Sequence, residues 1–219
     1  MPKAFRSNDI THAKVNTYFI NHEFFIVKKV KAQAALLLVV LVALYSFEVP
    51  KGWYKAGSNP DQYEIGIDKG AGMDGTNAAT IRSEGTRVRG FGTLVQNLKP
   101  GDFAGKRLRM SGYIRTADVA GWGGFWLRID GAKVGDPYVF DNMSNRKIKG
   151  TTDWKLCEII VDVPKKATNI AYGALLSGGG QLWFDNLTFE IVDESVPATI
   201  PYPKENAPQN QPTNLSFED

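Results

Sequence analysis

The sequence has little thiol or imidazole chemistry. It contains a single cysteine, Cys157, and its two histidines, His12 and His22, lie near the N-terminus. One cysteine excludes an intramolecular disulfide and a thiolate metal cluster. The lack of histidine elsewhere excludes a Ser-His-Asp triad and an imidazole metal site there. Because Cys157 alternates with Ile159 and Val161, we expect a small buried core residue rather than a reactive thiol.

Net positive charge is confined to the N-terminal segment. The formal net charge is +3, and residues 1–31 alone carry +4, so the remainder of the chain is close to neutral. A nucleic-acid-binding domain would show a basic face. We therefore expect no nucleic-acid partner.

One long apolar run is present. A basic leader (residues 1–31) precedes the apolar residues 32–47, a pattern typical of the h-region of a secretory signal. A short membrane anchor is the alternative, since a spanning helix usually needs about 20 apolar residues. A buried helix of a soluble protein is disfavoured, because nothing polar interrupts residues 34–44. We expect an N-terminal hydrophobic helix, signal or anchor, and an extracytoplasmic protein, secreted or anchored in the cytoplasmic membrane.

Residues 48–193 show alternating apolar residues separated by glycine-rich turns, without a long amphipathic helix. We expect strands at residues 63–68, 78–83, 92–98, 107–115, 124–130, 154–163, 169–176 and 181–193. Strands at this spacing predict an all-β domain, a jelly-roll β-sandwich. The inward side chains of two of these strands are expected to be Leu108, Met110 and Ile114, and Phe125, Leu127 and Ile129.

The closing strand carries an acid among apolar residues. At a period of two, Trp183, Asp185, Leu187, Phe189 and Ile191 share one face, which we expect to be buried. A buried acid needs a cation or several hydrogen-bond donors. Asp185 is therefore a candidate for a structural role.

The C-terminal part changes in composition. Residues 194–213 are rich in proline and predict an extended linker. Residues 214–219 are strand-like, and their Ser-Phe-Glu repeats residues 46–48. Either segment is a candidate first strand of the domain.

Several segments resemble the carbohydrate-binding-module type of galactose-binding-like jelly roll. They are residues 46–48 (SFE), 52–57 (GWYKAG), 98–102 (LKPGD) and 183–190 (WFDNLTFE). Residues 57–60, 140–143 and 149–154 also resemble small bacterial proteins that carry this domain alone. The resemblance implies carbohydrate binding. It also implies a structural Ca²⁺ between an acid of the last strand, Asp185, and an acid near the first, Glu48, or Glu218 if the tail docks. Alternatively, Asp185 accepts hydrogen bonds from the turn at residues 178–180.

Sugar recognition needs aromatic rings that stack on pyranoses and planar polar groups that bind hydroxyls. Residues of these types are expected to point outward on strands 107–115 and 124–130, and they form one face if the two strands share a sheet. A glycine-rich turn is expected between the strands at 121–124, with Trp122 at its tip, either beside that face or as a cap over the end of the sandwich. The candidate ligand-binding residues are Tyr113, Arg115, Trp122, Trp126, Arg128 and Asp130. The alternative is a solvated sheet face with Arg–Asp pairs and Arg–aromatic stacking.

The sequence offers little for catalysis. No pair of acids stands out as the two facing carboxylates that glycoside hydrolysis requires. We therefore predict a non-catalytic carbohydrate-binding module, exported or membrane-anchored, whose partner is carbohydrate or another small polar ligand. The membrane is a further partner if the hydrophobic segment is not cleaved. The alternatives are a ligand-sensing or regulatory module, and a structural protein–protein module that uses strand addition by residues 214–219.

Overall fold

The computed structural model describes residues 28, 29, 31, 47–133, 135 and 137–200. Most of the predicted leader, the hydrophobic segment up to residue 46 and the strand-like tail lie outside these residues. Among those described, no helix is long and apolar enough to cross a membrane.

Residues 47–200 fold into strands and short 3₁₀ turns. The strands are β1 (Tyr54–Gly57), β2 (Tyr63–Asp68), β3 (Ala78–Ser83), β4 (Phe91–Leu98), β5 (Arg107–Asp130), β6 (Val139–Asp141), β7 (Ile148–Asp162), β8 (Asn169–Ser177) and β9 (Gln181–Val192). The 3₁₀ turns are η1 (Pro60–Gln62), η2 (Met73–Gly75) and η3 (Gly101–Phe103). The predicted all-β class is confirmed.

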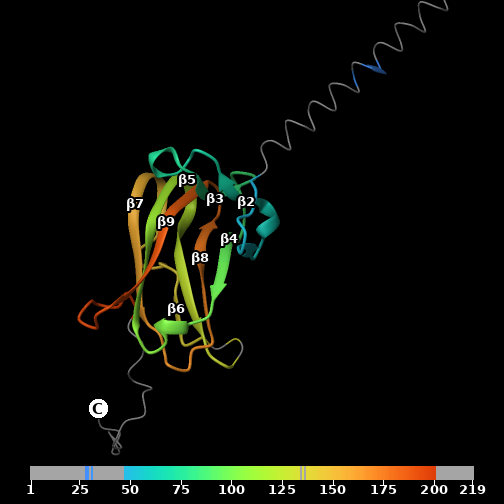
Figure 1. Ribbon diagram of the computed structural model, residues 1–219. Coiled ribbons are helices and arrows are strands. Elements are labelled where there is room, and N and C mark those ends of the chain that lie inside the picture. The colour runs from blue at the N-terminus through green and yellow to red at the C-terminus, as the bar shows by residue number, and fades with distance from the viewer. Residues whose placement is uncertain (1–27, 30, 32–46, 134, 136, 201–219) are drawn as a thin grey trace, which may run out of the picture. The chain divides into compact units, whose positions relative to one another are not determined.

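The strands form two antiparallel layers (Figure 1). Layer A has the order β2-β3-β9-β5-β7, and layer B has the order β1-β4-β8-β5-β6. Tyr172 of β8 meets Phe189 of β9 edge to face across the core, with ring centroids 4.7 Å apart. The chain passes between the layers from β1 to β2, from β3 to β4, from β4 to β5, from β6 to β7, from β7 to β8 and from β8 to β9, so successive strands wrap around one core.

Strand β5 belongs to both layers. Its first half pairs with β7 and β9, and its second half pairs with β8 and β6. The crossing lies near Asp118, whose φ of 51° accompanies shifts of register against β7. Such irregularities bend a strand and increase its twist. The prediction of two strands joined by a turn at residues 121–124 is therefore wrong.

Close contacts explain the glycines at this crossing. A Cβ on Gly121 would lie 2.1 Å from the carbonyl oxygen of Ser177, and one on Gly123 would lie 2.5 Å from Leu182. The glycines thus serve close packing within a continuous strand.

The core lies between the layers, as the alternation predicts. Leu108, Met110 and Ile114 are fully buried, and so are Phe125, Leu127 and Ile129. Inward residues are even-numbered in the first half of β5 and odd-numbered in the second, because the irregular crossing shifts the phase. Cys157 is buried as expected, and burial raises the pKa of its thiol to about 11.

The predicted buried face of β9 is wrong in its first half, and Ile191 near the end of the strand is 50% exposed rather than buried. Asn186 has a φ of 53°, and the β5–β9 register shifts beside it. This bulge moves the alternation by one residue. Leu182 and Phe184 are therefore buried, whereas Trp183 and Asp185 lie on the outer face of layer A.

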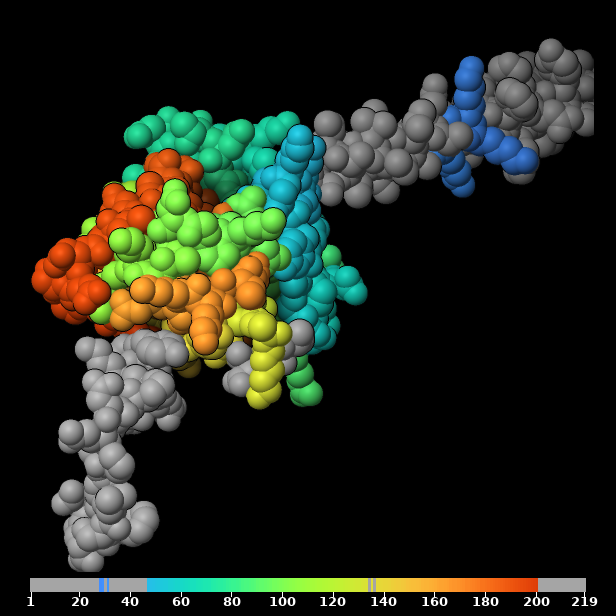
Figure 2. Space-filling model, turned by 60° about the horizontal axis from the view of Figure 1, so that its bottom comes forward, coloured from blue at the N-terminus to red at the C-terminus, as the bar shows by residue number. Residues whose placement is uncertain are grey.

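The connections at one end of the sandwich lie against each other. The β4–β5 connection (green) adjoins the β7–β8 connection (orange) in Figure 2, and the amide of Gly105 donates to the carbonyl of Val163 at 2.7 Å. Residues 193–200, here called the docking segment, follow β9 and return to the edge of β7. There the amide of Thr199 donates to the carbonyl of Ile160 at 2.8 Å.

Candidate functional site

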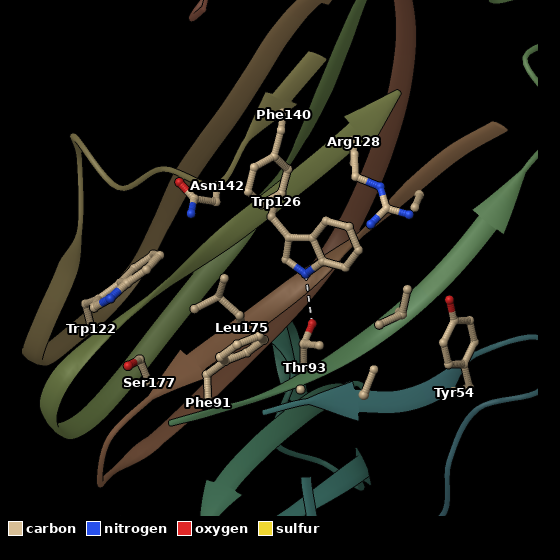
Figure 3. Close-up of a pocket in the computed structure, with 14 residues that line it drawn as sticks. Tyr54, Phe91, Thr93, Trp122, Trp126, Arg128, Phe140, Asn142, Leu175 and Ser177 are labelled. Atoms are coloured by element: carbon tan, nitrogen blue, oxygen red, sulfur yellow. Dashed lines mark hydrogen bonds between the residues drawn. The ribbon is translucent and has the colours of Figure 1, made fainter. Parts of the chain in front are cut away.

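A pocket of about 460 Å³ opens on the outer face of layer B (Figure 3). We call it the outer pocket. Its walls come from β1, β4, β5, β6 and β8, which the layer order places side by side. It is lined by Tyr54, Ala56, Gly57, Phe91, Thr93, Val95, Trp122, Trp126, Arg128, Phe140, Asn142, Ala171, Leu175 and Ser177.

The floor of the outer pocket is an apolar cluster separate from the main core. Val95, Trp126, Ala171 and Leu175 form it, and each is 9% exposed or less. These are outward residues of β4, β5 and β8. A second packed cluster on the solvent side of a sheet is unusual, because one face of an antiparallel sheet is commonly solvated.

Hydrogen bonds fix the central indole. Trp126 donates from Nε1 to Oγ1 of Thr93 at 2.8 Å, and Thr93 donates to the carbonyl of Ala174 at 2.6 Å. The buried indole nitrogen and hydroxyl are thereby satisfied, as buried polar atoms require. Trp126 thus presents only ring carbon to the pocket.

Exposed aromatic rings stand around this floor. Tyr54 is 46% exposed, Phe91 is 37% exposed and Phe140 is 48% exposed. Phe140 meets Trp126 at a steep angle, with ring centroids 6.4 Å apart (Figure 3). Large apolar side chains gathered at a surface mark interaction sites. Sequence reasoning missed these three residues, although each is an aromatic residue at an outward position of a short strand.

The polar groups of the outer pocket lie at its rim. Arg128 binds Asp130 through Nε at 2.7 Å and Nη2 at 3.1 Å. Asn142 accepts from the amide of Ser144 at 3.1 Å, which leaves its side-chain NH₂ group available. The hydroxyl of Tyr54 accepts from Asn97 at 2.9 Å and retains its own proton for donation. The rim therefore offers a small number of oriented donors.

The structure divides the predicted ligand-binding residues between two faces. Trp122, Trp126 and Arg128 line the outer pocket, and Asp130 holds Arg128 beside it. Tyr113 and Arg115 lie on the outer face of layer A, because β5 changes layers between the two groups. The six residues therefore do not form one face. Trp122 is a strand residue and not a loop tip, and its ring packs against Lys147.

Arg115 has a different environment from the pocket residues. Its guanidinium lies 4.4 Å from the ring centroid of Trp183 and 5.1 Å from that of Trp154, and it donates to the carbonyl of Ala71 at 3.1 Å. The indole nitrogen of Trp183 donates to Asp68 at 2.7 Å. This is the Arg–aromatic stacking foreseen as the alternative to sugar binding.

Of the predicted calcium ligands, Asp185 has hydrogen-bond donors in this structure, and they do not come from the turn at residues 178–180. Asp185 accepts from the amides of Met73 at 3.0 Å and Asn186 at 2.7 Å. Glu48 is exposed and forms an isolated bridge with Ile67. No group of three or more His, Cys, Asp or Glu residues suited to a metal ion occurs among the residues described. Calcium at Asp185 and Glu48 stays a prediction.

Comparison with known proteins adds one clear relative. The chain is 43% identical over 171 residues to the uncharacterized HTH-type transcriptional regulator YbfP of Bacillus subtilis (strain 168). The match covers 77% of this chain and 57% of that protein, so the chain spans little more than half of the relative. No protein-family model matches the chain.

Solved structures show a looser likeness. The CBM22-1 xylan-binding domain from Paenibacillus barcinonensis Xyn10C has a TM-score of 0.48 at 12% identity, covering 68% of this chain and 90% of that chain. TmCBM61 in complex with beta-1,4-galactotriose has a TM-score of 0.43 at 13% identity, covering 65% and 90%. The Stig cyclase Fisc from Fischerella sp. TAU has a TM-score of 0.48 at 13% identity, covering 68% and 90%. Similarity of this size assigns no ligand to the chain.

The relative corrects the predicted location. An HTH-type transcriptional regulator acts on DNA, which contradicts the expectation of an extracytoplasmic protein, secreted or anchored in a membrane. That expectation rested on the interpretation of residues 32–47 as a signal or anchor, a segment that lies outside the described residues up to residue 46. The expected absence of a nucleic-acid partner stays a prediction.

Proposed function

We propose that this chain contains a non-catalytic carbohydrate-binding module, and that sugar binds in the outer pocket of layer B. The supporting observation is the arrangement of exposed rings around an apolar floor. Tyr54, Phe91 and Phe140 offer faces for the apolar side of a pyranose, while Asn142 and Arg128 offer hydrogen-bond donors to its hydroxyls. Binding sites of small molecules generally combine a mostly apolar lining with such few oriented polar groups.

The lining of the outer pocket supports binding rather than chemistry. Its described residues include no Asp, Glu, His, Cys or Lys. Hydrolysis of a glycosidic bond needs two carboxylates on either side of it. Asp130 lies at the rim, but it is engaged by Arg128 and by Asn169 at 2.9 Å.

The relative favours a second candidate function. A chain similar to part of a transcriptional regulator fits a ligand-sensing or regulatory module. Such a module would use the same pocket, and the two candidates differ in what binding causes rather than in where the ligand binds.

A glycan array, followed by affinity electrophoresis on the retained polysaccharide, tests the proposal with single variants. We expect Phe140→Ala and Tyr54→Ala each to weaken binding at least about tenfold, which corresponds to about 1.4 kcal/mol of lost contact. Both side chains are about half exposed, so their removal should change the free energy of unfolding by less than about 1 kcal/mol.

Ile191→Ala provides the matched control. Ile191 is a large apolar residue, 50% exposed, on β9 in layer A. Its removal should leave glycan binding unchanged. If no glycan binds the wild-type chain, or if the Ile191 variant loses binding equally, the carbohydrate proposal fails.

A further inference from the structure

Strand β6 and the turn that follows it carry two residues of the outer pocket, and one buried acid lies between them. Phe140 and Asn142 face the pocket (Figure 3). Asp141 between them pairs with inward Leu127 of β5 and is 1% exposed. The position of Asp141 is therefore linked to the positions of its two pocket-facing neighbours. We call residues 139–146 the β6 corner.

Four hydrogen bonds converge on Asp141. Its Oδ1 accepts from the amide of Met143 at 2.9 Å and from Nη1 of Arg146 at 3.1 Å. Its Oδ2 accepts from Nη2 of Arg146 at 2.8 Å and from Oγ1 of Thr199 at 2.6 Å. A buried carboxylate requires such pairing, and charge-assisted hydrogen bonds are among the strongest in proteins.

The β6 corner is held in a demanding conformation. Met143 has a φ of 59°, in the left-handed region that side chains other than glycine seldom adopt. Met143 is also 3% exposed and packs against the backbone of Gly124. Strained positions persist where the surroundings over-determine them, and they cluster at ligand-binding sites. Here the amide of the strained residue is one of the four donors to Asp141.

Thr199 is the member of this network that comes from elsewhere in the chain. It belongs to the docking segment, which is fixed at two places. Thr199 pairs with Ile160, accepting from its amide at 3.0 Å, and the carbonyl of Val196 accepts from Arg107 at 2.7 Å. The docking segment thus contacts the β6 corner from the side of β7 and does not line the outer pocket.

We propose that Asp141 and Thr199 are positioning residues for the outer pocket, and that the docking segment holds Phe140 and Asn142 in their binding geometry. The role in ligand binding rests on the proposed function; the role in ordering the β6 corner does not. Because coupling between two sites is reciprocal, ligand binding and docking of residues 193–200 should stabilise each other.

The test is backbone amide hydrogen exchange in the full chain carrying Thr199→Val or Thr199→Ser. We expect Thr199→Val to speed exchange at residues 139–146 about fivefold, the equivalent of one hydrogen bond of about 1 kcal/mol. Thr199→Ser keeps the hydroxyl and should restore the wild-type rate. The near-ultraviolet circular dichroism of the chain, to which Trp126 packed against Phe140 contributes, should change with Thr199→Val and recover with Thr199→Ser.

The matched control is Thr80→Val in layer A, where a buried hydroxyl donates to the carbonyl of Leu182 at 3.0 Å. It should leave exchange at residues 139–146 unchanged. With a glycan retained by the wild-type chain, affinity should fall about fivefold in Thr199→Val alone. Unchanged exchange at the β6 corner in Thr199→Val, or equal changes in Thr80→Val, would overturn the proposal whether or not a glycan binds.

Discussion

The two outer faces of the sandwich share one strand and differ in what their side chains leave unpaired. On layer A, the outward residues of β5 are bound to neighbours: Arg107 to Asp162 at 2.8 Å, Arg109 to Glu158 at 3.3 Å, and Ser111 to Thr188 at 2.7 Å. On layer B, the outward side chains of the same strand include the indoles of Trp122 and Trp126, which border the outer pocket together with Arg128. A face whose polar groups are mostly paired has little left for a ligand; among the residues described, Nε of Arg109 and Nε of Arg115 on layer A are buried without a hydrogen bond.

Aromatic residues make the contrast sharper. On layer A, Trp183 and Trp154 pack against the guanidinium of Arg115. On layer B, Tyr54, Phe91 and Phe140 remain 37–48% exposed around Trp126. Rich aromatic content therefore does not by itself identify a binding face. What matters is whether the rings already have partners.

Substitution of the two central tryptophans should show the largest difference. Trp126→Ala removes a side chain that is 9% exposed and anchors the floor, so we expect a loss of about 3 kcal/mol in the free energy of unfolding, together with loss of glycan binding. Trp183→Ala removes stacking and one hydrogen bond on layer A, for which we expect about 1–2 kcal/mol and unchanged binding. Urea denaturation and affinity electrophoresis measure both.

Equal losses of glycan binding in the two tryptophan variants would contradict the contrast between the two layers, because layer A would then contribute to the binding site. Loss of binding in the Trp126 variant alone is informative only while that variant still unfolds cooperatively. Phe140→Ala, which leaves the floor in place, separates loss of contact from loss of fold.

The sandwich core was predictable because burial and alternation go together. Residues such as Leu108 and Met110 alternate with polar neighbours, and a period of two places them on one face. The bulge at Asn186 was not predictable in this way. A single extra residue exchanges the inward and outward directions of every later side chain. The apolar residues on both sides of Asn186 are compatible with either direction.

The candidate site was only partly predictable. Trp122, Trp126 and Arg128 follow from outward positions on one strand. Alternation does not say to which layer a strand belongs, so Tyr113 and Arg115 were placed with them. Tyr54, Phe91 and Phe140 come from three other strands, and their convergence depends on strand order. The inward residues of β5 do change from even to odd numbers along the chain, which is a signal of an irregular crossing.

Low pH should weaken the hydrogen bonds of Asp141, which support layer B. Burial by itself would raise the pKa of Asp141, but hydrogen bonds from Arg146, Thr199 and the amide of Met143 outweigh it and hold the pKa below its usual value. The folded pKa is thus depressed, so this contribution is present above the unfolded value near pH 4 and is lost as pH falls through the folded value. We expect the wild-type chain to lose stability more steeply than Asp141→Asn below about pH 4.

Denaturation in urea at a series of pH values measures this difference, and Asp153→Asn is the control. Asp153 is an exposed acid on β7 whose removal should leave the pH dependence as it is in the wild type. Parallel curves for the wild type and Asp141→Asn would mean that the buried pair with Arg146 contributes no net stability, as some buried ion pairs do not.

The smallest expected effect concerns layer A, where the predicted Ca²⁺ would join Asp185 to Glu48. If calcium is held there, EGTA should lower the Tm of the wild-type chain by a few degrees, because a ligand of the folded state alone stabilises it by mass action. Asp185→Asn should abolish that shift. An unchanged Tm would leave Asp185 with its hydrogen bonds to Met73 and Asn186 as its whole role. Layer A would then be a face stabilised entirely by its own side chains, which is the sharpest form of its difference from layer B.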